Sequence, residues 1–173
     1  MRLLRILNSI MDRLVMLLGA FLGSQIPEFM QQYTQRLSGH AAELSLLVNK
    51  LTQMASFSNK TLDQYIDKFL KSSDTDFARQ GEFMNDVVLR WRDIHMTLQS
   101  LTESSSLERP YYFFKYLNYP ITESTFQSFQ PGINLSIEGL CYTALGVILA
   151  FLFYQSIVKM ISAGYFMIRP ASS

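Results

Sequence analysis

The chain has 173 residues, of which 49% are hydrophobic and only 17% are charged, and its net charge is +1. A soluble domain usually has about 25% charged residues, so this chain has fewer charged residues than usual. Nucleic-acid binding usually needs a broad basic surface, so the net charge of +1 argues against a nucleic-acid partner. The single cysteine, Cys141, excludes an intramolecular disulfide and a cysteine-based zinc site.

The first apolar segment lies near the N-terminus. Residues 14–27 contain no charged side chain, and Arg2, Arg5 and Arg13 precede them. A secretory signal peptide has the same order of features, but no A-x-A-like cleavage site follows and the apolar pattern continues past Pro27. Because apolar residues at helical spacing also extend the segment backwards, we expect an uncleaved membrane span over about residues 6–28.

The same helix is expected to continue beyond the membrane. From Ile26 to Met54 apolar residues recur every three or four positions, until Ser58 and Asn59 end the pattern. Pro27 lies inside this helix, so we expect a kink there, with Ser24 close enough to help satisfy the backbone group that the proline leaves unpaired.

The sequence predicts helices in the middle of the chain, over residues 62–101. The spacing of apolar residues predicts an amphipathic helix over residues 62–70, then a loop with capping residues at 72–76. A third helix is predicted from Phe77 to Leu101, and the polar residues 103–106 end it. No strand alternation persists, so a β architecture is not expected.

A segment dense in aromatic residues follows Pro110, at residues 111–119, and Phe126 and Phe129 are expected in a short helix before Pro131. Two interpretations are open. The aromatic side chains close the top of a small helical bundle, which we favour, or they lie against the outer membrane interface ahead of the second span.

The second apolar segment is the clearest feature of the sequence. Residues 139–158 contain no charged side chain, and 20 helical residues span about 30 Å, the thickness of the hydrocarbon core of a bilayer. Ser136 can cap the helix, and Tyr142 and Tyr154 lie near its ends, where aromatic rings anchor at the interface. A buried core helix is the alternative, but so small a domain could not cover it.

Basic residues indicate the orientation of the spans. They lie before the first apolar segment and after the second: Arg2, Arg5, Arg13, Lys159 and Arg169. No lysine or arginine occurs between Lys115 and Lys159. Because basic residues favour the cytoplasmic side, both termini are expected in the cytoplasm.

We therefore expect an all-α membrane protein in which two transmembrane helices flank an extracytoplasmic, periplasmic helical hairpin or small bundle. The expected segments are residues 1–30 (cytoplasmic N-terminus and first span), 31–132 (periplasmic domain), 133–158 (second span) and 159–173 (short cytoplasmic tail).

Small residues one helical turn apart occur in both spans and allow close helix contact. These candidates for helix packing are Gly19 and Gly23 in the first span, and Gly139, Thr143, Gly146 and Ala150 in the second. They could pack the two spans together or pack copies of the protein against each other.

A polar stripe on the first long helix supplies the other candidates, for contact with a partner. Its residues are Gln25, Glu28, Gln32, Arg36, Gly39, His40 and Glu43. Gln25 and Glu28 lie at or near membrane depth, where polar groups need partners in the second span, in another protein or in pore water. His40 and Glu43 have the spacing of half a helical metal site, but the further ligands are too few. No catalytic residue, metal or cofactor is expected.

Two stretches resemble a known family. GSQIPEFMQQYTQRLSGHAAE, after a basic apolar N-terminus, and FQPGINLSIEGLCYTALGVILAFLFYQSI near the end are similar to an uncharacterised family of small two-span proteobacterial inner-membrane proteins. The resemblance implies an inner-membrane location with a periplasmic helical region. It implies no activity and no catalytic residue.

The favoured function is a non-enzymatic membrane scaffold or accessory subunit that presents its periplasmic helices to a partner. The partner is another membrane or periplasmic protein, or a second copy of the chain, besides the lipid bilayer itself. One alternative is a sensor-like ligand-binding module that acts through a partner. Another is a homo-oligomeric pore lined by Gln25 and Glu28. An enzyme is the least supported class.

Overall fold

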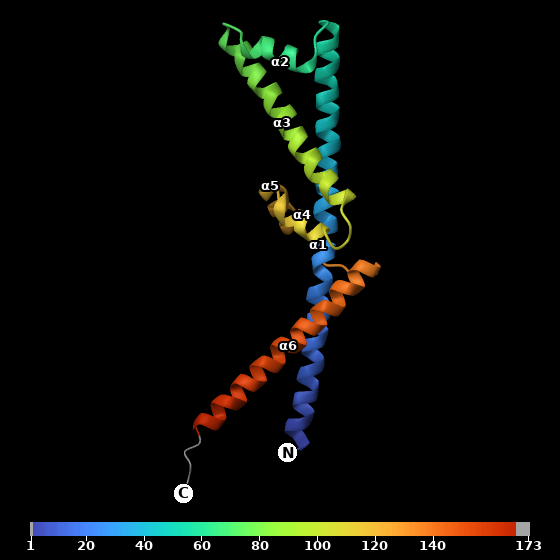
Figure 1. The fold of residues 1–173 in the computed structure, drawn as a ribbon, viewed down its shortest axis with the longest axis vertical. Coiled ribbons are helices and arrows are strands. Elements are labelled where there is room, and N and C mark those ends of the chain that lie inside the picture. The colour runs from blue at the N-terminus through green and yellow to red at the C-terminus, as the bar shows by residue number, and fades with distance from the viewer. Residues whose placement is uncertain (1, 169–173) are drawn as a thin grey trace. The chain divides into compact units, whose positions relative to one another are not determined.

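The computed structural model describes the backbone of residues 2–168 and the side chains of residues 10–160. Over residues 2–168 the chain is all-helical and has no strand, which confirms the predicted class (Figure 1). The helices are α1 (Arg2–Phe57), α2 (Leu62–Leu70), α3 (Thr75–Glu103), α4 (Arg109–Lys115), α5 (Tyr119–Gln127) and α6 (Ile137–Ile168).

The chain forms two compact units. The terminal unit consists of the residues up to Gln31 and those from Phe129 onward, and the central unit consists of Gln32–Ser128. The helix α1 contributes residues to both units. The periplasmic domain expected at residues 31–132 stays a prediction.

The end of α1 follows the prediction. Asn59 adopts a left-handed conformation with φ of 54°, which asparagine tolerates better than most residues. The amide of Lys60 donates to the carbonyl of Ala55 over 3.0 Å and closes the last turn. This backbone reversal stops the helix where its apolar pattern ends.

Inside α1, the expectation for Ser24 is wrong. The helix continues through Pro27, and the proline, which has no N–H, leaves the carbonyl of Gly23 without its helical donor. The hydroxyl of Ser24 donates instead to the carbonyl of Phe21, over 2.7 Å. A serine in a helix bonds backward along the chain, so its proton does not reach the carbonyl just before it.

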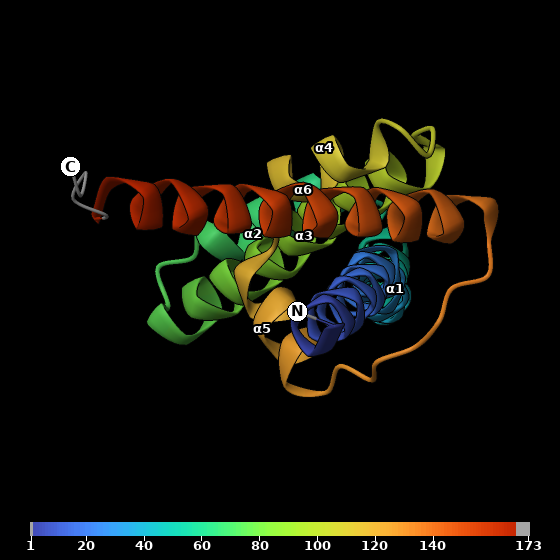
Figure 2. The same cartoon turned by 90° about the horizontal axis from the view of Figure 1, so that it is seen from below.

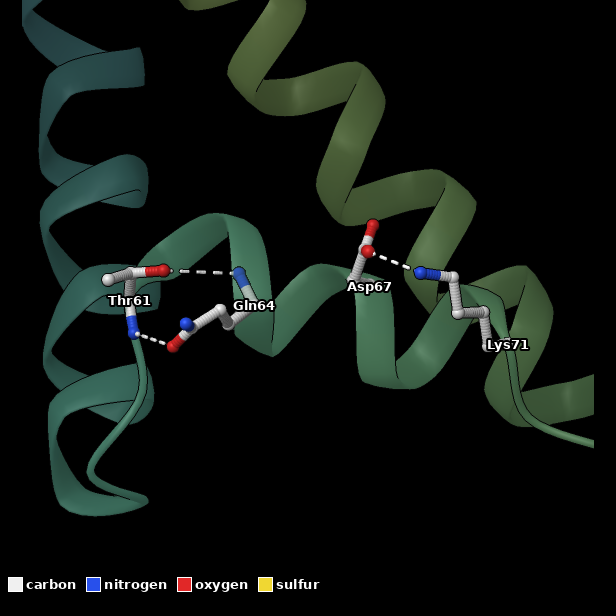
Figure 3. Close-up of polar contacts among 4 residues, drawn as sticks. All are labelled: Thr61, Gln64, Asp67 and Lys71. Atoms are coloured by element: carbon white, nitrogen blue, oxygen red, sulfur yellow. Dashed lines mark hydrogen bonds and ion pairs between the residues drawn. The ribbon is translucent and has the colours of Figure 1, made fainter.

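The start of α2 is fixed by a capping box, drawn in Figure 3. The amide of Gln64 donates to the hydroxyl of Thr61, and the amide of Thr61 donates to Oε1 of Gln64. At the other end Lys71 and Asp67 form an ion pair of 2.6 Å. Because both side chains of this ion pair are exposed, the ion pair stabilises α2 less than the capping box does.

The central unit has a core between α1, α2 and α3. Its buried residues are Val48, Ile66, Met84 and Val88, surrounded by the partly buried Leu51, Leu62, Tyr65, Phe69, Val87 and Trp91. Figure 1 shows α2 running from the end of α1 to the beginning of α3, and the core cluster includes residues from all three helices. Phe77, in the first turn of α3, is 54% exposed, and its ring lies 5.9 Å from that of Phe69.

Trp91 connects α3 to α1 by a polar contact within this core. Its indole Nε1 donates to the hydroxyl of Ser45 over 2.9 Å, and that hydroxyl donates to the carbonyl of Ala41 over 2.7 Å. His95 stacks on the indole with a centroid distance of 5.5 Å. The nitrogen of the half-buried indole is therefore satisfied inside the unit.

In the terminal unit, α6 is one unbroken helix (Figure 2). The hydroxyl of Ser136 accepts from the amide of Gly139 over 3.0 Å, which confirms the predicted cap. The helix extends past Val158, where the span was expected to end, and continues to Ile168. Residues 159–168, which were expected in a short tail, thus belong to this helix.

Two helices in the described chain are long and apolar enough to cross a membrane. They are α1 between Ile10 and Phe57 and α6 between Ile137 and Met160. Only 6% of the most apolar stretch of α6 is buried, against 22% for α1. Neither helix has the burial of a soluble core helix.

The contact between α2 and α3 depends on Gly81. A Cβ atom at this position would lie 2.6 Å from the amide nitrogen of Leu70. We expect Gly81→Ala to lower the free energy of unfolding by about 1–3 kcal/mol, since backbone must move to admit the methyl group. Chemical denaturation of the detergent-solubilised chain, followed by circular dichroism, measures this.

The matched control for this prediction is Gly39→Ala in α1. A Cβ at Gly39 would meet nothing within 4 Å, so alanine should raise stability by about 0.5–1 kcal/mol through helix propensity. Equal effects of the two substitutions would contradict the predicted close approach.

Candidate functional site

The terminal unit contains a close helix crossing built from glycine. A Cβ at Gly19 would lie 2.6 Å from the carbonyl oxygen of Gly146, and a Cβ at Gly23 would lie 2.5 Å from that of Tyr142. A Cβ at Gly146 would in turn lie 2.9 Å from Cα of Gly23. The backbones of α1 and α6 therefore touch, with Ala150 beside Gly19, and larger side chains do not fit.

Gly139 and Thr143 take part in a different contact. A Cβ at Gly139 would lie 2.9 Å from the carbonyl carbon of Asn134, in the turn before α6. The hydroxyl of Thr143 donates to the carbonyl of Gly139 over 2.8 Å. Of the six small-residue candidates, Gly139 and Thr143 thus make contacts within the first turns of α6 and the turn before it. The other four lie at the crossing of α1 and α6.

Gln25 lies against the connector that leads into α6. Its Nε2 atom is 3.2 Å from the carbonyl oxygen of Gly132 and 2.8 Å from the hydroxyl of Ser24. Its Oε1 atom is buried and has no hydrogen-bond partner among the described residues. Glu28 lies beside the same connector, because a Cβ at Gly132 would be 3.1 Å from its Cδ.

Two further contacts hold this connector to α1. The rings of Phe29 and Phe129 pack at 5.6 Å, and Nδ2 of Asn134 donates to Oε1 of Gln31 over 3.1 Å. Phe129 was expected inside a short helix, but α5 ends at Gln127, and the ring packs on α1 instead. The polar residues Gln25, Glu28 and Gln31 of α1 thus contact the connector that leads into α6.

In the central unit, α1 binds α4 and α5 through two residues. Arg36 donates to the hydroxyls of Ser124 and Ser128. Tyr33 is fully buried, its ring meets Phe113 edge-on at 5.0 Å, and its hydroxyl accepts from the amide of Asn118 over 3.1 Å.

The phenol of Tyr33 stays neutral at physiological pH. Burial raises the pKa of Tyr33, the hydrogen bond from Asn118 opposes that rise, and the charge of Asp93 adds to it. Tyr33 therefore acts as a neutral acceptor that helps fix the start of α5, not as a titrating group.

The aromatic residues of α4 and α5 correct the core prediction. Among the aromatic residues of α4 and α5 only Phe113 is buried, and it is joined by the aliphatic Ile121, whereas several other apolar side chains of this region are exposed. We call the exposed set the aromatic surface: Leu107, Tyr111, Phe114, Tyr116, Tyr119 and Phe126, with exposed fractions from 39% to 93%. A helix of seven residues has one inward face, so it cannot bury every ring of an aromatic run.

Lys115 lies among these rings. Its ammonium is 5.0 Å from the ring centroid of Tyr116 and 5.6 Å from that of Tyr111. A hydrogen bond to Tyr116 and the nearby Tyr111 raise the pKa of Lys115, so the group remains a cation.

The residues of the polar stripe divide between the two compact units. Gln25 and Glu28 belong to the terminal unit, while Gln32, Arg36, Gly39, His40 and Glu43 belong to the central unit. Gln32 and His40 are half-buried, and Gly39 and Glu43 are exposed. Within residues 10–160 no three His, Cys, Asp or Glu side chains gather to hold a metal ion.

Sequence reasoning missed Ser124, Ser128 and Asn118 as contacts. One signal was available for Asn118, because an asparagine two residues before Pro120 is typical of a helix start. The two serines follow no motif, and only the packing of α5 on α1 identifies them.

A family model described as a protein of unknown function (DUF2937) matches residues 7–165. The chain therefore belongs to that family. This confirms the part of the predicted resemblance that concerned an uncharacterised family. No curated protein and no solved structure matches the chain.

The crossing predicts a strong effect at Gly146. We expect Gly146→Leu to separate α1 from α6 and to destabilise the terminal unit by about 1–3 kcal/mol, because backbone atoms occupy the space that leucine needs. The melting temperature of the purified protein in mild detergent measures the loss.

Ala144→Leu is the control, since Ala144 lies on the same helix and is exposed. It should change stability by no more than about 0.5 kcal/mol. A Gly146→Leu protein as stable as this control would show that the crossing does not matter to the fold.

Proposed function

We propose that this member of the DUF2937 family is a two-span protein of the bacterial inner membrane that serves as a non-enzymatic scaffold or accessory subunit. Its central unit would then face the periplasm and bind a partner protein. The proposal depends mainly on one observation, the 6% burial of the apolar stretch of α6.

The free-energy cost of leaving α6 in water supports the membrane location. Its exposed apolar residues include Leu140, Leu145, Ile148, Leu149, Phe151, Leu152 and Phe153. Burying such a side chain fully is worth about 1.5–3 kcal/mol, so seven half-exposed ones cost on the order of 5–10 kcal/mol. That cost approaches the whole stability of a typical domain, about 5–15 kcal/mol, and a bilayer removes it.

The distribution of basic residues supports an orientation with both termini in the cytoplasm. Arg13 precedes the first apolar segment and Lys159 follows the second, while residues 116–158 contain no lysine or arginine. The bilayer retains basic residues on its cytoplasmic side. The central unit would accordingly be periplasmic.

The helix crossing favours a partner other than a second copy bound through the spans. Gly19, Gly23 and Gly146 are already covered by contact within one chain. Self-association through these same faces would have to break that contact first. Gln25 similarly engages the carbonyl of Gly132, which weighs against a role in lining a pore.

An exposed apolar stripe on α1 offers a surface for the partner. We call it the partner stripe, and its residues are Leu46, Leu47, Met54 and Phe57, with exposed fractions from 42% to 88%. At 100° per residue these positions fall within about 100° of one another on the helix, together with Glu43 and Lys50. Such a face suits an amphipathic helix of another protein.

Topology is tested with single cysteines in a Cys141→Ser background. An impermeant maleimide should label Phe57→Cys in intact spheroplasts and label Lys159→Cys only after lysis, because the membrane separates the two positions. Labelling of both before lysis, or release of the protein by alkaline carbonate, would contradict the two-span arrangement.

The partner stripe is tested by a matched pair of methionine substitutions. Met54 on α1 is 52% exposed and Met96 on α3 is 61% exposed. We expect Met54→Lys to reduce crosslinked partner recovery from membranes at least fivefold, as when an interface residue worth about 1 kcal/mol is lost. Met96→Lys should leave recovery unchanged, and equal recovery from both variants would contradict this assignment.

A further inference from the structure

The partner stripe of α1 carries two opposite charges inside its apolar surface. Glu43, Lys50 and Phe57 are seven residues apart, and seven residues make almost two full turns of a helix, so these three lie in one row. Leu46 and Leu47 lie on either side of that row, and all five side chains are exposed. This spacing is typical of helix faces that pair in coiled coils, in which a charged side chain within the apolar seam selects the partner.

Neither charge has a partner among the residues whose side chains are described, 10–160. The ion pairs there lie on and beside α2 and α3, and no hydrogen bond involves the side chain of Glu43 or Lys50. The two cannot pair with each other, because seven residues of helix rise about 10 Å. A helix that covered Leu46 and Leu47 would displace water from both charges, so it would have to offer each an opposite charge.

The packing of α5 sets one end of this surface. Arg36 lies in the same row one repeat earlier, and its guanidinium donates to the hydroxyls of Ser124 and Ser128 at the end of α5. The row is therefore covered at Arg36 by a neighbour within the central unit. At Gly39 the surface is open, and from there to Phe57 it extends for about 27 Å, the length of a helix of about 18 residues.

A parallel second copy of the chain does not suit this surface. A two-fold axis along α1 would bring each residue against its counterpart, so Glu43 would face Glu43 and Lys50 would face Lys50. Both contacts would join like charges from which water is excluded, and such contacts cost binding free energy. The charges therefore disfavour parallel self-association through the partner stripe.

An antiparallel second copy would match the charges but meet α5. A two-fold axis across α1 that brings Glu43 against Lys50 of the second copy also brings Arg36 against Phe57 of the second copy, because the two residue numbers of each pair keep the same sum. Arg36 is already covered by α5. The second copy would have to displace α5 to bury its Phe57, so the packing of the central unit disfavours this arrangement too.

We propose that the partner stripe binds an amphipathic helix of a different protein, which places a basic side chain against Glu43 and an acidic side chain against Lys50. Apolar side chains of that helix cover Leu46, Leu47 and Met54. The inference rests on the partner stripe proposed above and specifies the chemistry of its occupant. The residues that carry it all belong to the central unit.

The test uses the full-length protein in mild detergent and three fluorescent synthetic peptides. Each peptide is a stapled helix of about 18 residues, to match the open length of the surface, and all three have the same leucine positions. They differ only at two positions seven residues apart on the apolar face, which are one lysine and one glutamate, two glutamates, or two lysines. Fluorescence anisotropy measures their binding.

Charge reversal on the protein should change which peptide binds best. The unmodified chain should bind the mixed peptide at least about fivefold more tightly than the other two. Glu43→Lys should favour the peptide with two glutamates, and Lys50→Glu the peptide with two lysines. The matched controls are Glu82→Lys on α3 and Lys68→Glu on α2, which are exposed, change the net charge equally and should keep the order of the unmodified chain.

Other results would overturn the inference in distinguishable ways. Equal binding of the three peptides that Met54→Lys abolishes would remove the charge match and leave the proposed partner stripe intact. Absence of binding by every peptide would remove the charge-matched helix, and the recovery experiment with Met54→Lys would still decide the proposed function separately.

Sedimentation equilibrium of the same detergent-solubilised protein tests for a second copy. The inference expects no dimer through the partner stripe. A dimer that Glu43→Lys dissociates and that the double variant Glu43→Lys, Lys50→Glu restores would assign the surface to an antiparallel second copy and overturn the inference, because both charge contacts return in the double variant.

Discussion

One helix, α1, contributes residues to both compact units with one unbroken backbone. A helix satisfies its own backbone hydrogen bonds, so in the two-span arrangement proposed above α1 can leave lipid and enter water without a change of structure. Its side chains change instead. In the first half, apolar residues such as Leu14, Leu17 and Phe21 are exposed, and lipid would cover them in that arrangement. In the second half, Leu37, Leu44 and Val48 are buried on one face and form the core.

Glycine residues determine how closely the helices approach, as much as the larger packed side chains do. At Gly19, Gly23 and Gly146 the backbones of α1 and α6 touch, and at Gly81 α3 touches the end of α2. Each contact leaves no space for a methyl group, whereas Gly39 is open. A small-residue spacing by itself does not distinguish these cases. Gly139 has the same spacing, but the atoms nearest to it belong to Asn134 in the preceding turn.

Elements governed by local chemistry could be predicted from the sequence. The turn at Asn59 and the caps at Thr61, Asp74 and Ser136 depend on residues within one helical turn. The bounds of α2 and α3 were accordingly predicted to within two residues, whereas α6 continues to Ile168, past its predicted end at Val158. The burial of a side chain depends on residues far away in the sequence, so it was harder to predict. Hydrophobicity cannot reveal which ring of the run from Tyr111 to Tyr119 faces Tyr33. It therefore predicted a core where the structure has one buried ring and an exposed surface.

The hydrogen bond between Trp91 and Ser45 gives the chain a built-in optical reporter. Trp91 is its single tryptophan, and its indole lies between α1 and α3 with His95 stacked on it. Tryptophan emission from the intact protein therefore originates in the central unit alone. Separation of α3 from α1 would hydrate the indole and shift that emission to the red, whatever happens to the terminal unit. The packing of one unit can thus be followed without dividing the protein.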